Sequence, residues 1–105
     1  MQFSAHAAAS VTQVKLTGRL EFTDHERLSD IIALIGANDA PLFTLDLRQL
    51  EFIDSAGLGM LLILNEQAQE RGVGMKILVA NGGAVRQTVA LARIDGVVGI
   101  EYDPS

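Results

Sequence analysis

The middle of this chain alternates between apolar runs and a helical pattern in an order that few folds can accommodate. Residues 42–47, Leu-Phe-Thr-Leu-Asp-Leu, and residues 75–80, Met-Lys-Ile-Leu-Val-Ala, are apolar at most positions, as is typical of strands buried on both faces of a parallel sheet. Residues 56–71 between them show a helical pattern that ends before Gly72. Two parallel strands need a long crossover, which a helix supplies. The sequence therefore predicts a βαβ unit in an α/β domain.

Shorter elements are expected on both sides of this unit. Residues 3–8 and 11–16 are strand candidates, and residues 9–10 could turn a hairpin between them. After the unit, residues 84–93 space their apolar side chains as a third helix, and residues 97–102 could add a short last strand. The predicted order is β-β-α-β-α-β-α with a possible short last strand, in a mixed β-sheet with α-helices packed on it.

The first helix has a recognisable start. Thr23 and Glu26 are spaced as the two ends of a capping box with Thr23 as the N-cap. Just before it, Gly18 marks a bend or a bulge, and residues 18–23 are expected to form a loop. Apolar residues at i, i+3, i+4 and i+7 then predict the buried face of the helix, which consists of Leu28, Ile31, Ile32 and Ile35.

Size and charge exclude several classes of function. A chain of 105 residues supports one modest core, so a single domain over residues 1–105 is expected and an enzyme with an interdomain cleft is excluded. The formal net charge of −5 would repel a phosphate backbone, which argues against nucleic-acid partners. Cysteine is absent, in keeping with a reducing compartment.

No stretch of the sequence is suited to a membrane. No apolar run is longer than that at 60–64, whereas a membrane span needs about 20 apolar residues. No Lys or Arg precedes Lys15, so the start of the chain does not read as a signal peptide. We therefore expect a cytoplasmic protein without membrane insertion.

The segment 52–59, Phe-Ile-Asp-Ser-Ala-Gly-Leu-Gly, is not explained by burial alone. Gly57 and Gly59 fall in the first turn of the predicted helix, where each costs about 1 kcal/mol relative to alanine. They could keep the helix end open to another backbone or to a phosphate. Ser55 stands where an N-cap belongs, and Asp54 places a carboxylate at the positive end of the helix dipole.

Two interpretations of this segment remain open. In the first, Ser55 caps the helix, Asp54 complements the dipole and the glycines allow close packing against the sheet. In the second, Ser55 is an accessible phosphorylation site at a partner-binding helix end. A phosphate would add about 1.5–2 negative charges there, next to Asp54, and would abolish a contact while the fold is retained.

Three motifs together resemble the STAS family (sulphate transporter and anti-sigma factor antagonist domains). The segment Leu45-Asp46-Leu47 followed by 52–59 is similar to the family signature. Gly18-Arg19-Leu20-Glu21 resembles its Gly-x-Leu-Asp/Glu turn, although Glu21 replaces the Asp of many members, and the turn at 81–85 also corresponds. The resemblance extends over about residues 11–102.

The resemblance implies a bacterial anti-sigma factor antagonist without enzymatic activity. Such a protein binds a serine kinase/anti-sigma factor of the histidine-kinase-like ATPase class, which phosphorylates the serine that matches Ser55, and a serine phosphatase restores it. The implied alternatives are a phosphorylation-independent STAS subunit of a lipid-transport ABC complex and a stress-sensing scaffold. The expected partner-binding residues are Glu21, Phe22, Thr23, Asp54, Ser55, Ala56, Gly57 and Gly59.

No catalytic, metal or cofactor site is expected. Asp24, His25 and Glu26 could suggest acid–base chemistry, but they form the first turn of the predicted helix and suit its dipole. His6 and His25 lack the spacing of metal ligands, Ser55 lacks a nucleophile elbow, and the chain has no P-loop lysine.

Two apolar features have two interpretations each. Phe22 is either a hydrophobic staple for the first helix or an exposed anchor for a partner. The block at 60–64 is apolar on all sides, so it belongs to the core, and part of it could also emerge beside Ser55.

Overall fold

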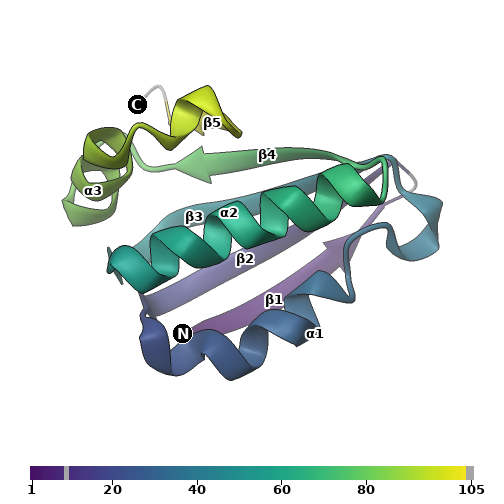
Figure 1. The fold of residues 1–105 in the computed structure, drawn as a ribbon, viewed down its shortest axis with the longest axis horizontal. Helices are drawn as coiled ribbons and strands as arrows, with labels where there is room; N and C mark the ends of the chain where they lie inside the picture. Colours follow the sequence, from purple (N-terminus) through teal and green to yellow (C-terminus); the bar gives the residue numbers. More distant parts are fainter. Residues whose placement is uncertain (9, 104–105) are drawn as a thin grey trace.

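A five-stranded mixed sheet forms the framework of the protein (Figure 1). The computed structural model describes residues 1–8 and 10–103, so residue 9 of the predicted hairpin turn lies outside the described residues. The strands lie side by side in chain order, with β1 antiparallel to β2 and all other neighbours parallel. Their bounds are β1 Gln2–Ala7, β2 Val11–Leu20, β3 Leu42–Ile53, β4 Gly74–Val79 and β5 Gly99–Tyr102.

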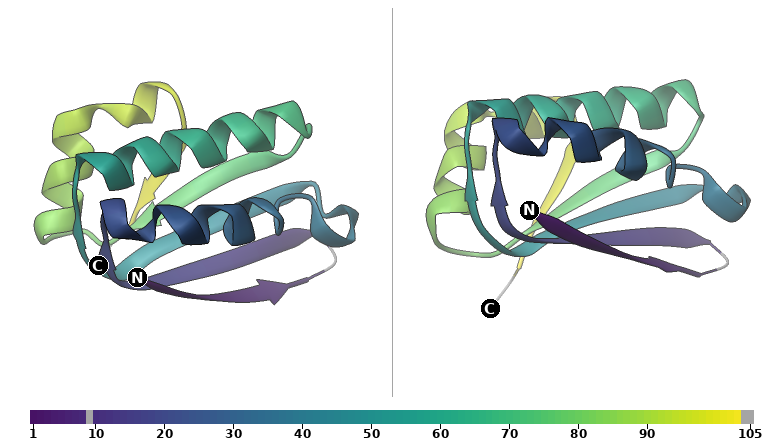
Figure 2. Two further views of the ribbon diagram at one scale, coloured as in Figure 1. Left: turned by 60° about the horizontal axis from the view of Figure 1, so that its bottom comes forward. Right: turned by 90° about the horizontal axis from the view of Figure 1, so that it is seen from below.

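The helices lie on one side of this sheet. Figure 2 shows α1 and α2 next to each other over one face, with α3 at one end of the molecule. No helix of the described chain covers the opposite face. The helical segments are η1 Phe22–Arg27, α1 Leu28–Ile32, η2 Ala37–Asp39, α2 Ser55–Glu70, α3 Ala84–Ala92 and η3 Ile94–Gly96. The predicted mixed α/β sheet and its short last strand are therefore confirmed.

The core lies between the helices and the sheet. Alternate residues of β3, Phe43, Leu45 and Leu47, are almost completely buried, as are Leu61 and Leu64 of α2. β3 pairs in parallel with both β2 and β4, but only its face beneath the helices is apolar. Thr44, Asp46 and Arg48 alternate with the core residues on the open face, so the expectation of a strand buried on both faces is wrong. The predicted βαβ unit is β3, α2 and β4, and it is the centre of the molecule.

The first helix begins earlier than predicted and is less regular. The Thr23 capping box is wrong, because the chain turns at Glu21 directly after β2 and continues as the 3-10 helix η1. Asp24 takes the role assigned to Glu26, since its Oδ2 accepts a hydrogen bond of 2.8 Å from the N–H of Glu21. Asp24 is 7% exposed, so its carboxylate is buried in this turn, whereas His25 and Glu26 are exposed.

The packing of this helix matches the prediction better than its backbone does. Leu28, Ile31 and Ile35 are buried and Ile32 is half-buried, as the i, i+3, i+4, i+7 pattern indicates. Only residues 28–32 are α-helical, because a 3-10 segment precedes them and Gly36 leaves the helical region with a φ of +79°.

β2 is longer than expected, and residues 18–20 belong to it rather than to a loop. The β2–β3 register shifts between Lys15 and Thr17 and again between Gly18 and Arg19. Gly18 has a φ of +82°, a conformation that glycine adopts without strain. These irregularities confirm the predicted bulge, and they allow β2 to continue to Leu20, at the edge where α2 begins.

An ion pair between the buried Asp46 and the exposed Arg48 lies on the sheet face that the helices leave open. Asp46, 3% exposed, accepts two hydrogen bonds of 3.0 Å from the guanidinium of Arg48, and a third of 3.0 Å from the Arg48 N–H. Burial raises the pKa of Asp46, but the hydrogen bonds and charge of Arg48 outweigh that effect and hold the pKa below its ordinary value of 3.8.

This lowered pKa predicts an acid-dependent contribution to stability. The unfolded chain binds the Asp46 proton at a higher pH than the folded chain does, so the contribution is present above pH 3.8 and is lost as the pH falls through the folded pKa. In Asp46→Asn, the free energy of unfolding should be lower at neutral pH and should fall less steeply with acidification below about pH 4. Urea denaturation at a series of pH values measures the free energy of unfolding and its dependence on pH. If this free energy fell equally steeply with acidification in the two proteins, the stabilising role of ionised Asp46 would be contradicted.

Candidate functional site

The candidate site lies where the carboxyl ends of β2 and β3 meet the amino end of α2. Asp54 joins these elements through its backbone and its side chain. Its N–H donates to the carbonyl of Leu20 over 3.2 Å, and its Oδ2 accepts from the N–H of Phe22 over 3.3 Å. The two sequence-predicted groups, around residues 21–23 and residues 54–59, are therefore brought together.

Asp54, rather than Ser55, is the N-cap of α2. The Asp54 backbone is extended and its Oδ1 accepts a hydrogen bond of 2.7 Å from the N–H of Gly57. Ser55 is the first helical residue and is exposed. The prediction of a Ser55 cap is wrong because β3 ends at Ile53, which leaves Asp54 as the extended residue before the helix. The hydroxyl of Ser55 has no hydrogen bond to any residue that the structure describes.

The two glycines of α2 differ in their surroundings. A Cβ on Gly57 would lie 2.6 Å from the carbonyl oxygen of Leu20 and 2.7 Å from Cγ1 of Ile53. A Cβ on Gly59 would meet no heavy atom within 4 Å. Gly57 therefore allows α2 to pack closely against the ends of β2 and β3. Gly59 leaves the helix surface one turn after Ser55 without a side chain.

The residues before η1 form the other half of the site. Phe22 is 71% exposed, so it is not a staple; its ring stacks at 6.5 Å, centre to centre, on His25. Thr23 is exposed beside it, and Glu21 forms an ion pair with Arg19. The Phe22 backbone is thus held next to the start of α2 by its hydrogen bond to Asp54.

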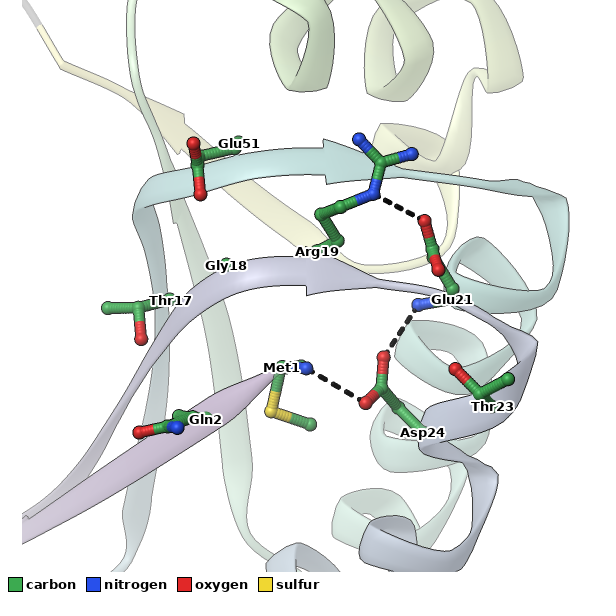
Figure 3. Close-up of a pocket in the computed structure, with 9 residues that line it drawn as sticks. All are labelled: Met1, Gln2, Thr17, Gly18, Arg19, Glu21, Thr23, Asp24 and Glu51. Atoms are coloured by element: carbon green, nitrogen blue, oxygen red, sulfur yellow. Dashed lines mark hydrogen bonds and ion pairs between the residues drawn. The ribbon is translucent and has the colours of Figure 1, made fainter.

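A polar pocket of about 520 Å³ lies behind this turn (Figure 3). Figure 3 shows the carboxylate of Asp24 directed at both the amino group of Met1 and the backbone nitrogen of Glu21. Burial raises the pKa of Asp24, but these two hydrogen bonds and the charge of Arg27 outweigh it and lower the pKa. Asp24 therefore remains ionised and holds the turn in place.

Arg19 and Asp24 are site residues that the sequence analysis did not select. Arg19 lies with its guanidinium carbon 4.1 Å from the centre of the Phe52 ring and pairs with Glu21. An Arg two residues before Glu21 on an extended strand shares a face with it, which is a signal that could have been used. For Asp24 the three-residue spacing from Glu21 is a local signal of a capping box, whereas its bond from the Met1 amino group, 23 residues away, has none.

The apolar block at 60–64 divides between core and surface. Met60, Leu61 and Leu64 are buried, whereas Leu62 and Ile63 are 36% and 39% exposed.

In residues 1–8 and 10–103, no three His, Cys, Asp or Glu side chains are placed to hold a metal ion. Within the same ranges, no helix is long and apolar enough to cross a bilayer.

A known protein family matches most of this sequence. The family model described as "Mlab, STAS domain" matches residues 3–99. The chain belongs to the STAS domain family. A comparison of this STAS domain with curated proteins found no significant match.

Solved structures share the same fold at low sequence identity. An anti-sigma factor antagonist from Mycobacterium paratuberculosis is 22% identical with a TM-score of 0.82, covering 99% of this chain and 86% of that one. The phosphorylated Bacillus cell fate determinant SpoIIAA, also solved unphosphorylated, is 16% identical with a TM-score of 0.66, covering 99% and 93%. A sulfate transporter family protein from Wolinella succinogenes is 20% identical with a TM-score of 0.68, covering 89% and 76%. The STAS fold of this chain is therefore established.

The unequal surroundings of the two glycines predict opposite effects of the same substitution. Gly57→Ala should lower the free energy of unfolding, because its methyl group would collide with the Leu20 carbonyl. Gly59→Ala should raise it by up to about 1 kcal/mol, the helix propensity difference. Urea denaturation of the two variants measures the effects, and a stabilised Gly57→Ala would contradict the packing described for α2.

Proposed function

We propose that this STAS domain is an anti-sigma factor antagonist that is switched off by phosphorylation of Ser55. The observation that carries the proposal is the exposed Ser55 hydroxyl at the first position of α2, with the N-cap role taken by Asp54. A phosphate on this oxygen would not remove the helix cap. Modification could therefore change a binding surface without unfolding the helix.

The electrostatics of the helix end favour a switch. The dipole and the free N–H groups of the first turn attract a phosphate, so the modified chain remains folded. The carboxylate of Asp54 is the adjacent side chain, and it also holds the N–H of Phe22. A phosphate dianion next to Asp54 repels it, so the modification acts on the Phe22 turn as well as on α2.

The proposed docking surface consists of residues from both halves of the site. Phe22 supplies an exposed aromatic anchor of the type that dominates interface energies. Gly59 leaves room for a partner's backbone, and the exposed Leu62 extends the apolar area along α2. The proposed docking surface is Glu21, Phe22, Thr23, Asp54, Ser55, Ala56, Gly59 and Leu62, with Gly57 in a supporting role beneath it.

The proposed partner is a serine kinase/anti-sigma factor of the histidine-kinase-like ATPase class, with a serine phosphatase reversing the modification. SpoIIAA, a protein of the same fold, has been solved with and without phosphate, which supports phosphorylation as the mode of control. The chain would act by binding in the cytoplasm, without catalysis, nucleic acid or membrane insertion. Its net charge of −5 means that a phosphate adds to a charge already negative.

A second candidate follows from the family match. The matching STAS model bears the description Mlab, whereas the antagonists enter the comparison through structures no more than 22% identical. The alternative is a STAS subunit of a lipid-transport ABC complex that binds its ATPase without phosphorylation. The same docking surface would serve it, and Ser55 would then be only a contact residue.

Incubation with a genomically adjacent kinase of this class and ATP tests the proposal. Intact-mass measurement should show the addition of one phosphate, fragment masses should place it on Ser55, and Ser55→Ala should show none. Ser55→Ala should unfold at nearly the wild-type temperature, because Asp54 provides the cap. Absence of phosphate on Ser55 would contradict the switch.

Binding measurements separate the two candidates. Under the switch, calorimetry should show that Ser55→Asp loses kinase binding by at least about tenfold while its circular dichroism spectrum is unchanged. Ser10→Asp is the matched control, since Ser10 is exposed before β2, at the opposite end of that strand from Leu20. Co-purification with a membrane ATPase that is unaffected by Ser55→Asp would support the second candidate instead.

A further inference from the structure

The edge strand β1 is a second exposed surface, separate from the docking surface. β1 pairs with β2 on one side only and is the outermost strand of the described sheet (Figure 2). Five of its six residues are exposed, and Phe3 is half-buried. Its other long side therefore carries backbone N–H and C=O groups that no neighbouring strand satisfies.

The register shows which residues present these groups. The N–H of Ala8 donates to the carbonyl of Val11 over 2.9 Å, so this is a hydrogen-bonded position of the antiparallel ladder. Hydrogen-bonded and non-hydrogen-bonded positions alternate, so the backbone of Phe3, Ala5 and Ala7 points away from β2. The carbonyl of Met1, next in this series, is bound by Arg27 over 2.8 Å. The open edge therefore begins at Phe3.

This edge lacks the protection that natural edge strands usually have. Its sequence, Gln-Phe-Ser-Ala-His-Ala, contains no Lys, Arg, Asp, Glu or Pro, which are the residues that discourage pairing with another strand. The opposite edge, β5, has four residues and carries Glu101 in an ion pair with Lys76. In a chain of net charge −5, β1 is thus a neutral strand where two copies can approach without charge repulsion.

We propose that two copies of this chain pair through β1, antiparallel and in register about Ala5, to form one continuous sheet. The three outward residues are spaced evenly about Ala5, so this register pairs Phe3 with the second copy's Ala7 and Ala5 with its equivalent. Every outward N–H and C=O of residues 3, 5 and 7 is then bonded. The large Phe3 lies opposite the small Ala7, which avoids a clash across the two-fold axis.

The same register fixes the side-chain pairs on the open face of the sheet. Ser4 and His6 pair with Lys15 and Gln13 of β2, so they lie on that face, where each Ser4 is opposite the second copy's His6. A second copy covers this edge and has its own open edge covered in the same contact, because the pairing is symmetric and each outward group faces its equivalent. Helices α1 and α2 lie on the other face of the sheet.

Sedimentation equilibrium over about 1–500 μM protein tests the dimer, and a charge exchange tests its register. Ser4→Glu with His6→Lys places opposite charges across the two-fold axis and should retain the dimer. Ser4→Glu with His6→Glu places like charges there and should raise the dissociation constant by about tenfold or more. Gln69→Glu with Gln87→Glu, both exposed on α2 and α3, adds two negative charges elsewhere and should leave the dimer intact.

Each outcome supports the proposal or overturns it. Far-UV circular dichroism and thermal unfolding of each variant establish that the monomer is folded. A wild-type chain that stays monomeric throughout the series would overturn the proposal, as would a dimer that responds equally to both charge pairs. Ala5→Pro is an independent variant, since it removes an outward N–H and no bond to β2; it should also dissociate the dimer.

Discussion

Asp54 connects the start of α2, the end of β2 and the Phe22 turn by hydrogen bonds. One oxygen caps α2 through Gly57, and the other holds the N–H of Phe22. The Asp54 N–H meanwhile bonds to the end of β2 at Leu20. The start of α2, the end of β2 and the Phe22 turn are therefore all hydrogen-bonded to Asp54. A change in charge next to Asp54 affects the hydrogen bonds of all three.

This arrangement also accounts for the two glycines, which the sequence alone treats as equivalent. Gly57 is required by the close approach of α2 to Leu20, because any side chain there would meet the carbonyl that receives the Asp54 N–H. Gly59 has no such neighbour. One glycine belongs to the framework of the site, and the other shapes the surface that a partner would meet.

Much of the fold could be predicted from the sequence, because the apolar pattern of β3, α2 and β4 has one simple explanation in a parallel sheet. Local caps were predicted less well. Two adjacent residues, Asp54 and Ser55, are both good N-caps, and only the end of β3 decides between them. Glu26 was expected in the role of Asp24 because Thr23 is a better N-cap residue than Glu21, although Glu21 and Asp24 have the same three-residue spacing. The bond from the Met1 amino group to Asp24 joins residues 23 apart and leaves no local pattern.

The position of the site at two strand ends has a consequence for folding. Phe22 and Asp54, which are 32 residues apart in sequence, meet only after β2 and β3 have paired. Parallel pairing of this kind is non-local and forms late relative to local helical structure. A newly synthesised or partly unfolded chain therefore contains Ser55 but lacks the Phe22 turn next to it. Under the proposed function, a partner that needs both would bind only molecules in which β2 and β3 have paired, so recognition would depend on completed folding.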